Sequence, residues 1–287
     1  MRKITIFSIL IALIVAMSVI PTGFADDANS VVITYGETAY MNQNYKSMVD
    51  QYFENNAAVD LNNVETKVIT ASDVNAISSG ISHKTYNSNQ IFSSALVDLN
   101  QNGNIEVFVD NTITTITPKM YASALESAGI ESGRVYVTSP VTATGESALA
   151  GIMNSYEEAT DVEIPDNVKE AANNEIQTQA AIVENSNVSA DDLSKLVDEV
   201  KDTVEEENIT DHAEIVNIIN DYSTTYNINI SDSDIDNLAS TIEQIQSVQA
   251  DADSYKEQLN DVIDNASSDG FSLDSIFNSI LSAFGFR

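Results

Sequence analysis

The sequence predicts an α/β fold, a mixed sheet with flanking helices and one β-hairpin, followed by an all-helical C-terminal region. Three observations predict it. Short β-rich runs alternate with helical runs between residues 28 and 160, and an Asn-Gly pair separates two of the apolar runs. After Pro165, apolar residues recur only at helical spacing. We therefore expect an α/β domain over residues 28–160 and a helical region over residues 161–268.

Six β-rich runs in the first half predict the strands of the sheet. Gly36 closes the first run, as expected for a residue that ends a strand. Asn102 and Gly103 separate the third and fourth runs and form the strongest short-range signal for a hairpin turn. The runs cover residues 31–35, 64–70, 91–99, 105–109, 113–116 and 135–137.

Three helices are predicted among these strands, over residues 40–53, 118–129 and 145–159. The second has the clearest start. Thr117 can act as its N-cap, and Pro118 suits the first helical position because its missing N–H is not needed there.

The helices of the second half are predicted from three capping signatures. Each has Ser or Asp followed three residues later by an acidic residue, and an apolar helical pattern comes next. The signatures begin at Ser189, Asp211 and Ser231. The last helix can continue to Asn265, which would make it roughly 50 Å long. A break near Ala250 is the alternative, because the middle of this segment is polar.

Composition excludes several classes of protein. The 287 residues include 44 acidic and 12 basic side chains, a net charge of −32, and no Cys. A chain without cysteine has no disulfide framework, iron–sulfur cluster or thiol nucleophile. Scarce Lys and Arg argue against a nucleic-acid partner, because phosphate neutralisation needs clustered cations. The hydrophobic fraction of 43% is sufficient for a folded core.

The N-terminal segment has the pattern of a secretory signal peptide over residues 1–25. Arg2 and Lys3 precede an apolar run, and Gly23 and Ala25 supply small residues before an acidic start. We expect cleavage after Ala25, a secreted or extracytoplasmic cell-surface location, and no spanning helix after cleavage. An uncleaved membrane anchor is the alternative, since the apolar run approaches spanning length.

Residues 269–287 form an apolar amphipathic segment, predicted as a C-terminal helix. The segment is too short and too mixed to span a bilayer. Docking on the helical region is the expected role. An interfacial helix and a partner-docking motif are the alternatives.

A candidate ligand site lies at two predicted strand ends, one at Gly36 and one in the link from residue 138 to the helix at Gly145. Junctions between strands and helices are where α/β folds bind ligands, because free backbone N–H groups gather there. Ordinary helix capping by Thr144 is the competing interpretation. The candidate residues are Gly36, Glu37, Thr138, Ser139, Thr142, Thr144 and Ser147, and none is assigned a catalytic role.

Calcium is the one cofactor that the sequence suggests. Asp98, Asn100 and Asn102 occupy places 1, 3 and 5 of a pattern of EF-hand type, with Gly103 at place 6. The match then fails, because place 12 is Val109 in place of Glu. A polar hairpin turn is therefore the alternative to a weak calcium site.

Four stretches carry a resemblance to a known family. They are residues 34–37, 111–122, 135–153 and 169–175. Over roughly residues 28–205 the chain resembles the YpuA-like secreted proteins, domain-of-unknown-function family 1002. The resemblance implies an exported protein with an α/β core and a helical tail, and it implies no activity. The helices after Asp211 and the apolar C-terminus fall outside it.

The leading functional hypothesis is an exported, non-catalytic protein that acts at the cell envelope by binding a partner. The partner and the oligomeric state are left open. A secreted hydrolase with its site near Gly36 and Thr138–Ser147 is one alternative, and a weak calcium-binding protein is the other.

Overall fold

The computed structural model describes residues 30–78, 85–100 and 103–267. The predicted signal peptide and the predicted helix over residues 269–287 lie outside the described residues.

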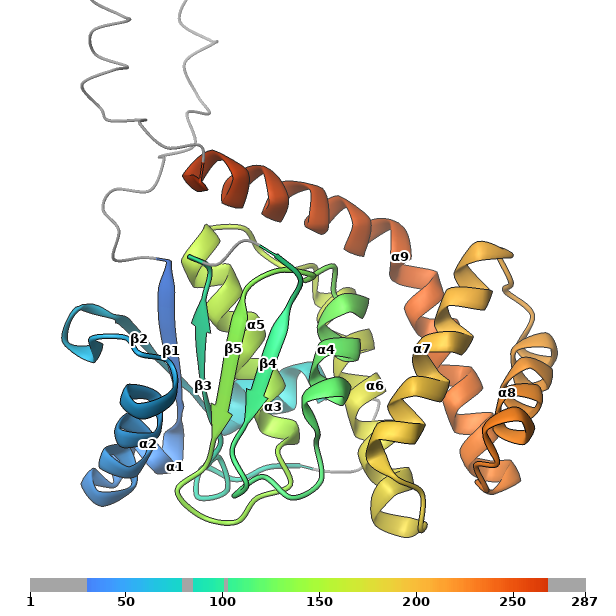
Figure 1. Cartoon of the computed structure of the whole chain (residues 1–287), viewed down its shortest axis with the longest axis horizontal. Coiled ribbons are helices and arrows are strands. Elements are labelled where there is room, and N and C mark those ends of the chain that lie inside the picture. Colours follow the sequence, from blue (N-terminus) through green and yellow to red (C-terminus); the bar gives the residue numbers. More distant parts are fainter. Residues whose placement is uncertain (1–29, 79–84, 101–102, 268–287) are drawn as a thin grey trace, which may run out of the picture.

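A mixed sheet forms the centre of the first half, as the sequence predicts, with five strands from the six predicted runs (Figure 1). Its order is β2-β1-β3-β5-β4. Strand β3 is antiparallel to both of its neighbours, and the β1–β2 and β4–β5 pairs are parallel. The strands are β1 (Val31–Gly36), β2 (Glu65–Ile69), β3 (Ser94–Asp98), β4 (Glu106–Val109) and β5 (Arg134–Thr138).

The predicted β-hairpin around Asn102-Gly103 is wrong. Strands β3 and β4 do not pair, because β5 lies between them and bonds to both. Residues 135–138 of β5 are buried on both faces of the sheet, whereas β4 alternates between exposed and half-buried residues. A strand that is apolar on both faces belongs inside a sheet, and this burial outweighs the local turn preference. The run over residues 113–116 forms no strand, only one bridge from Ile113 to Ala143.

The described residues contain nine α-helices, and four of the predicted caps are confirmed. Thr117, Ser189, Asp211 and Ser231 each accept a backbone N–H three residues further on. The helices are α1 (Glu37–Met41), α2 (Gln43–Asn56), α3 (Ala71–Ser78), α4 (Pro118–Ser127), α5 (Glu146–Thr160), α6 (Asp166–Asn185), α7 (Ala190–Glu206), α8 (His212–Tyr226) and α9 (Asp232–Ser267).

Helix α9 is continuous over 36 residues, so the alternative break near Ala250 is wrong. Its two halves are buried in different clusters. Ile235 and Leu238 pack with α7 and α8, whereas Tyr255 and Leu259 pack in the core behind the sheet. Two separate apolar clusters therefore hold the two halves of this continuous helix.

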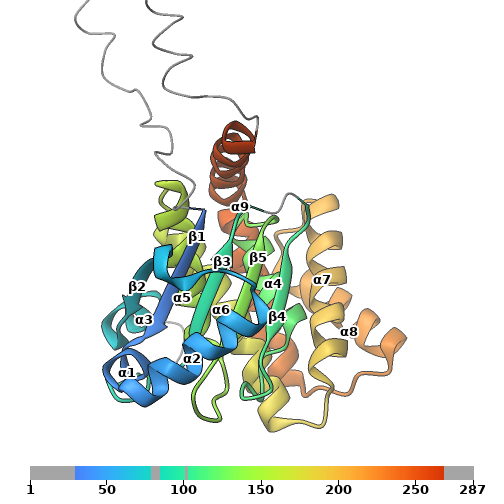
Figure 2. The ribbon, with the colours of Figure 1, turned by 60° about the vertical axis from the view of Figure 1, so that its left-hand side comes forward.

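Helices cover both faces of the sheet. Figure 2 shows α2 on one face and α5 and α6 on the other. The larger core lies between the sheet and helices α4, α5, α6 and the second half of α9. A second cluster joins α7, α8 and the first half of α9 into a helical bundle. None of the helices in the described ranges combines the length and apolar character that crossing a bilayer requires.

Candidate functional site

The two predicted strand-end loops lie at one edge of the sheet. Strand β3 is antiparallel, so its first residue lies between the last residues of β1 and β5. The backbone N–H of Gly36 donates to Ser94 Oγ at 3.1 Å, and Ser94 pairs with Thr138. The two strand ends that the sequence singles out are therefore close in space.

Most polar groups at this edge bond within the protein. Glu37 Oε2 accepts the N–H of Ala71, and the Thr138 hydroxyl donates to Asp110 at 2.6 Å. Ser139 and Ser147 are buried, whereas Thr142 is exposed. These contacts show that hydroxyl groups in the loops stabilise the loops themselves. Ligand binding by the seven candidate residues stays a prediction.

The predicted capping role of Thr144 is wrong. The N-cap of α5 is Gly145, which has φ 112° and makes no side-chain cap bond. The Thr144 hydroxyl donates to the carboxylate of Glu146 instead. The positive φ of Gly145 turns the chain into the helix one residue later than the sequence pattern indicates.

The candidate calcium loop is described in part. Asp98 is buried, and its Oδ1 accepts the N–H of Asn100 at 2.9 Å, an ordinary Asx turn. Asn102 lies outside the described residues. Over residues 30–78, 85–100 and 103–267, no group of three or more acidic or histidine residues could hold a metal ion. Calcium binding here stays a prediction, which calorimetric titration of the protein and its Asp98→Ala variant would check.

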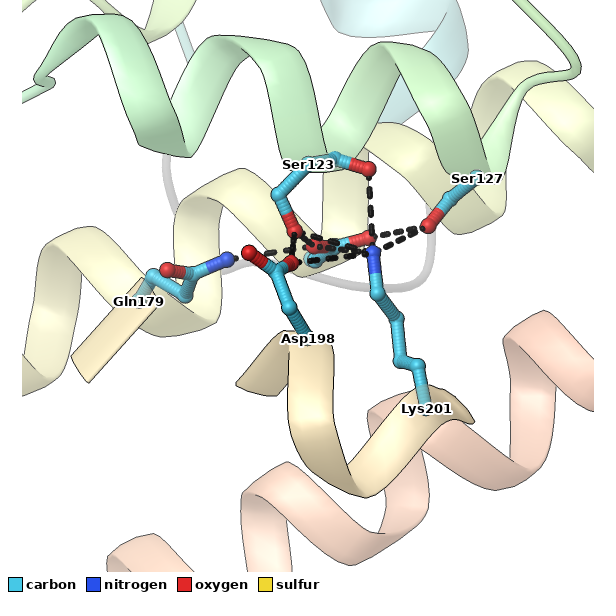
Figure 3. A network of polar contacts seen from close by, with 6 residues as sticks. Ser123, Ser127, Gln179, Asp198 and Lys201 are labelled. Carbon is cyan, nitrogen blue, oxygen red and sulfur yellow. Dashed lines mark hydrogen bonds and ion pairs between the residues drawn. The ribbon is translucent and has the colours of Figure 1, made fainter. Parts of the chain in front are cut away.

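A polar network that was not predicted from the sequence joins three helices, with Glu175 fully buried and Asp198 partly exposed (Figure 3). Its members are Ser123 and Ser127 of α4, Glu175 and Gln179 of α6, and Asp198 and Lys201 of α7. Within α4 and α6 the pairs are four residues apart, and within α7 they are three apart, so each pair lies on one helix face. No spacing links the three helices along the chain, so only the tertiary structure could bring these pairs together.

Lys201 is the centre of this network. Its Nζ lies 2.8 Å from Ser123 Oγ, 2.9 Å from Ser127 Oγ and 3.1 Å from Glu175 Oε1. The carbonyl of Ser123 is a fourth acceptor, at 3.0 Å. Since an ammonium has only three N–H groups, this environment uses all of them. The Glu175 side chain is 0% exposed, and the ion pair is thus buried and fully hydrogen-bonded.

The contact between serine and lysine invites comparison with a catalytic dyad, in which a neutral lysine removes the serine proton. Here the Glu175 carboxylate lies 3.1 Å from the amine and favours its charged form. An ammonium cannot accept a proton. Ser127 and Lys201 do line a cleft of about 160 Å³ between α4, α7 and α9. The charge arrangement supports a structural role for the lysine and gives no support for a general base.

Comparison with known proteins places the chain in a family. The profile of the family described as "Protein of unknown function (DUF1002)" matches residues 35–262. The chain belongs to this family. It is also 26% identical, over 261 residues, to the uncharacterized protein YpuA of Bacillus subtilis (strain 168). That alignment covers 90% of this chain and 87% of the relative. No solved structure matches the chain.

The match corrects the extent of the expected resemblance. We expected it to end near residue 205, before the helix that follows Asp211, but the DUF1002 profile continues to residue 262. Helices α8 and most of α9 are therefore part of the family pattern. The reason is visible in the packing, since α9 contributes Tyr255 and Leu259 to the core behind the sheet.

A second feature of this DUF1002 protein lies on the face of the sheet that α2 covers, opposite the larger core. We name it the aromatic strip. Met48 is 51% exposed and Phe108 is 42% exposed. The Phe108 ring stacks on Tyr136 with centroids 4.9 Å apart, and Tyr45 meets Phe92 edge-on at 6.1 Å. The strip consists of Tyr45, Met48, Tyr52, Phe92, Phe108 and Tyr136. Met48 belongs to it as the exposed residue one helical turn before Tyr52, and Tyr136 is itself buried and stacked on the exposed Phe108.

Proposed function

We propose that this protein is exported and acts at the cell envelope, without catalysis, by binding a partner through the aromatic strip. The exposure of Met48 and Phe108 carries the proposal. Large apolar side chains that gather on a protein surface mark interaction sites, and interface cores are rich in Tyr, Phe and Met. Tyr40 and Met41 of α1, 44% and 80% exposed, extend the apolar character at the start of α2.

The position of the strip also favours docking. Phe108 belongs to β4, which is an edge strand of the sheet. Tyr52 of α2 lies in the same apolar cluster as Tyr136 of β5, so the strip passes from the helix onto the sheet. A partner can therefore contact rigid helix and strand positions together, which limits the side-chain entropy that binding would cost.

The binding experiment compares three forms of the chain that begins at Asp26. The test variant combines Met48→Asp with Phe108→Asp, and the control carries Ala213→Asp at an exposed position of α8. We expect immobilised wild type and control to retain the same envelope protein, and the test variant to retain at least tenfold less. Circular dichroism verifies that all three are folded. Equal retention by the three forms would refute the role of the strip.

Export is tested separately from binding. We expect the protein isolated from its native cells to begin at Asp26, because cleavage after Ala25 follows the small-residue pattern. Mass spectrometry of the N-terminal peptide measures this directly. A chain that retains Met1 and remains inside the cell would contradict export and leave the strip to be judged on binding alone.

A further inference from the structure

The hydroxyl of Ser123 has more hydrogen-bonding neighbours than hydrogens to share with them. Its Oγ lies 2.5 Å from Glu175 Oε1, 2.5 Å from Asp198 Oδ1 and 2.8 Å from Lys201 Nζ. Each of these contacts needs one hydrogen between its two heavy atoms. The serine supplies one and the lysine supplies another. The third hydrogen has to come from a carboxyl group.

The two carboxyl groups differ in how they are supported. Glu175 accepts from Ser127 Oγ at 2.5 Å, from Gln179 Nε2 at 3.1 Å and from Lys201 Nζ at 3.1 Å. These three donors, the ammonium among them, stabilise the Glu175 carboxylate. Asp198 has the ammonium only at 3.7 Å and bonds to Ser123 alone within the network. The extra hydrogen therefore belongs on Asp198.

We propose that Asp198 is held in its protonated form as a donor to Ser123 Oγ, and that this bond is a proton-dependent clamp between α4 and α7. Helix α4 packs in the core behind the sheet, whereas α7 belongs to the helical bundle. The clamp thus joins the two cores of the molecule at the bond between Ser123 and Asp198.

The surroundings of Asp198 act on its ionisation in both directions. Lys201 and the hydrogen bond with Ser123 favour the ionised form, whereas Glu175 of α6, Asp202 of α7 and Glu126 of α4 oppose it. Burial is the largest effect and raises the pKa of Asp198 above its ordinary value. Because the folded pKa is the higher one, the stabilisation is complete below the ordinary pKa of about 3.9 and is lost as pH rises through the raised value. Acid tightens the clamp and alkali loosens it.

The test compares the full chain with two variants that each remove one carboxylate from α7. Asp198→Asn keeps a hydrogen donor for Ser123 and cannot ionise, and Glu206→Gln is the control at an exposed position of α7. We expect the Tm of Asp198→Asn, relative to wild type, to rise by about 2–4 °C between pH ~3.5 and pH ~7. The control should show no such rise. Parallel curves for the two variants would overturn the proposal.

A second measurement does not depend on any variant folding. In a carboxyl-carbon NMR titration of the wild-type chain, we expect Asp198 to titrate above the ordinary Asp pKa of about 3.9. The Asp198→Asn spectrum is needed only to assign the signal. Titration of Asp198 at or below a pH of about 3.9 would show that it holds no extra proton, and would end the proposal.

Discussion

At the scale of single residues, the structure depends on positions whose surroundings admit only one type of amino acid. Gly145 lies where β5 turns into α5, with φ 112°. A Cβ there would lie 2.7 Å from Tyr121 Oη and 2.7 Å from Ile113 Cγ2. Tyr121 also donates to the Gly145 carbonyl at 2.6 Å, so the ring cannot move away without losing a buried hydrogen bond.

Substitution of Gly145 by Ala should therefore destabilise the protein by about 2–4 kcal/mol, because backbone strain and a buried clash add. Thermal or urea denaturation measures the change in the free energy of unfolding. Gly103→Ala is the matched control, since Gly103 has φ 142° and nothing within 4 Å of the added carbon. Similar losses for both variants would show that the clash with Tyr121 is not a constraint.

The buried ion pair allows a second prediction at this scale. Removing Glu175 alone should cost about 3–5 kcal/mol, because Glu175→Leu leaves the Lys201 ammonium buried beside two hydroxyls without its close counter-ion. The double variant Glu175→Leu/Lys201→Met removes both charges and should be more stable than the single one. Urea denaturation of both variants measures this. A double variant less stable than the single one would contradict a structural role for the pair.

At the scale of helices and strands, local sequence signals determined the helix caps, whereas contacts distant in the sequence determined the strand order. The caps of α4, α7, α8 and α9 were predictable because a cap is a contact between residues three apart. Helix α3 was not predicted, since only Ala71, Val74 and Ser78 of its eight residues are buried. The order of β3, β4 and β5 was mispredicted. Which strands pair depends on which of them are buried, and the turn signal at Gly103 carries no information about burial.

His212 joins two helices by an ionic contact. Its Nε2 lies 3.1 Å from Asp236 Oδ1 and its Nδ1 lies 3.2 Å from Glu243 Oε2, so both ring nitrogens must donate. The hydrogen bond to Asp236, with a further contribution from Glu243, raises the pKa of His212. The stabilisation is complete below the unfolded pKa of about 6.5 and is lost as pH rises through the raised value.

Replacement of His212 by Gln should thus destabilise the contact between α8 and α9 at pH ~5.5, by less than about 1 kcal/mol, because the site is open to solvent. The difference should vanish above the raised pKa. Chemical denaturation at several pH values measures it, and His83→Gln provides a control for loss of the other histidine. A difference that grows as pH rises would contradict the sign.

At the scale of the whole molecule, the net charge of −32 is the dominant electrostatic feature. Like charges repel in the compact state, and salt screens them. Lysines such as Lys46, Lys67 and Lys256 each contact a carboxylate. Because 44 acidic side chains face only 12 basic ones, most acidic groups have no cation to compensate their charge.

The Tm should consequently rise by several degrees as NaCl increases from ~0.01 M to ~0.15 M, since the Debye length falls from about 30 Å to about 8 Å. Differential scanning calorimetry in NaCl and in KCl at equal ionic strength separates screening from ion-specific binding. A Tm that is unchanged or lower in both salts would show that stabilising ion pairs outweigh the repulsion.

The sequence by itself determined most of the helices, four of their caps, the mixed character of the sheet and the resemblance to the DUF1002 family, which the profile match confirms. These properties follow from residue spacing within one segment. Only the tertiary structure decided that β5 separates β3 from β4, and that Ser123, Glu175 and Lys201 meet in one buried network. Such neighbours are set by which apolar surfaces bury one another, and burial joins residues that no periodicity along the chain connects.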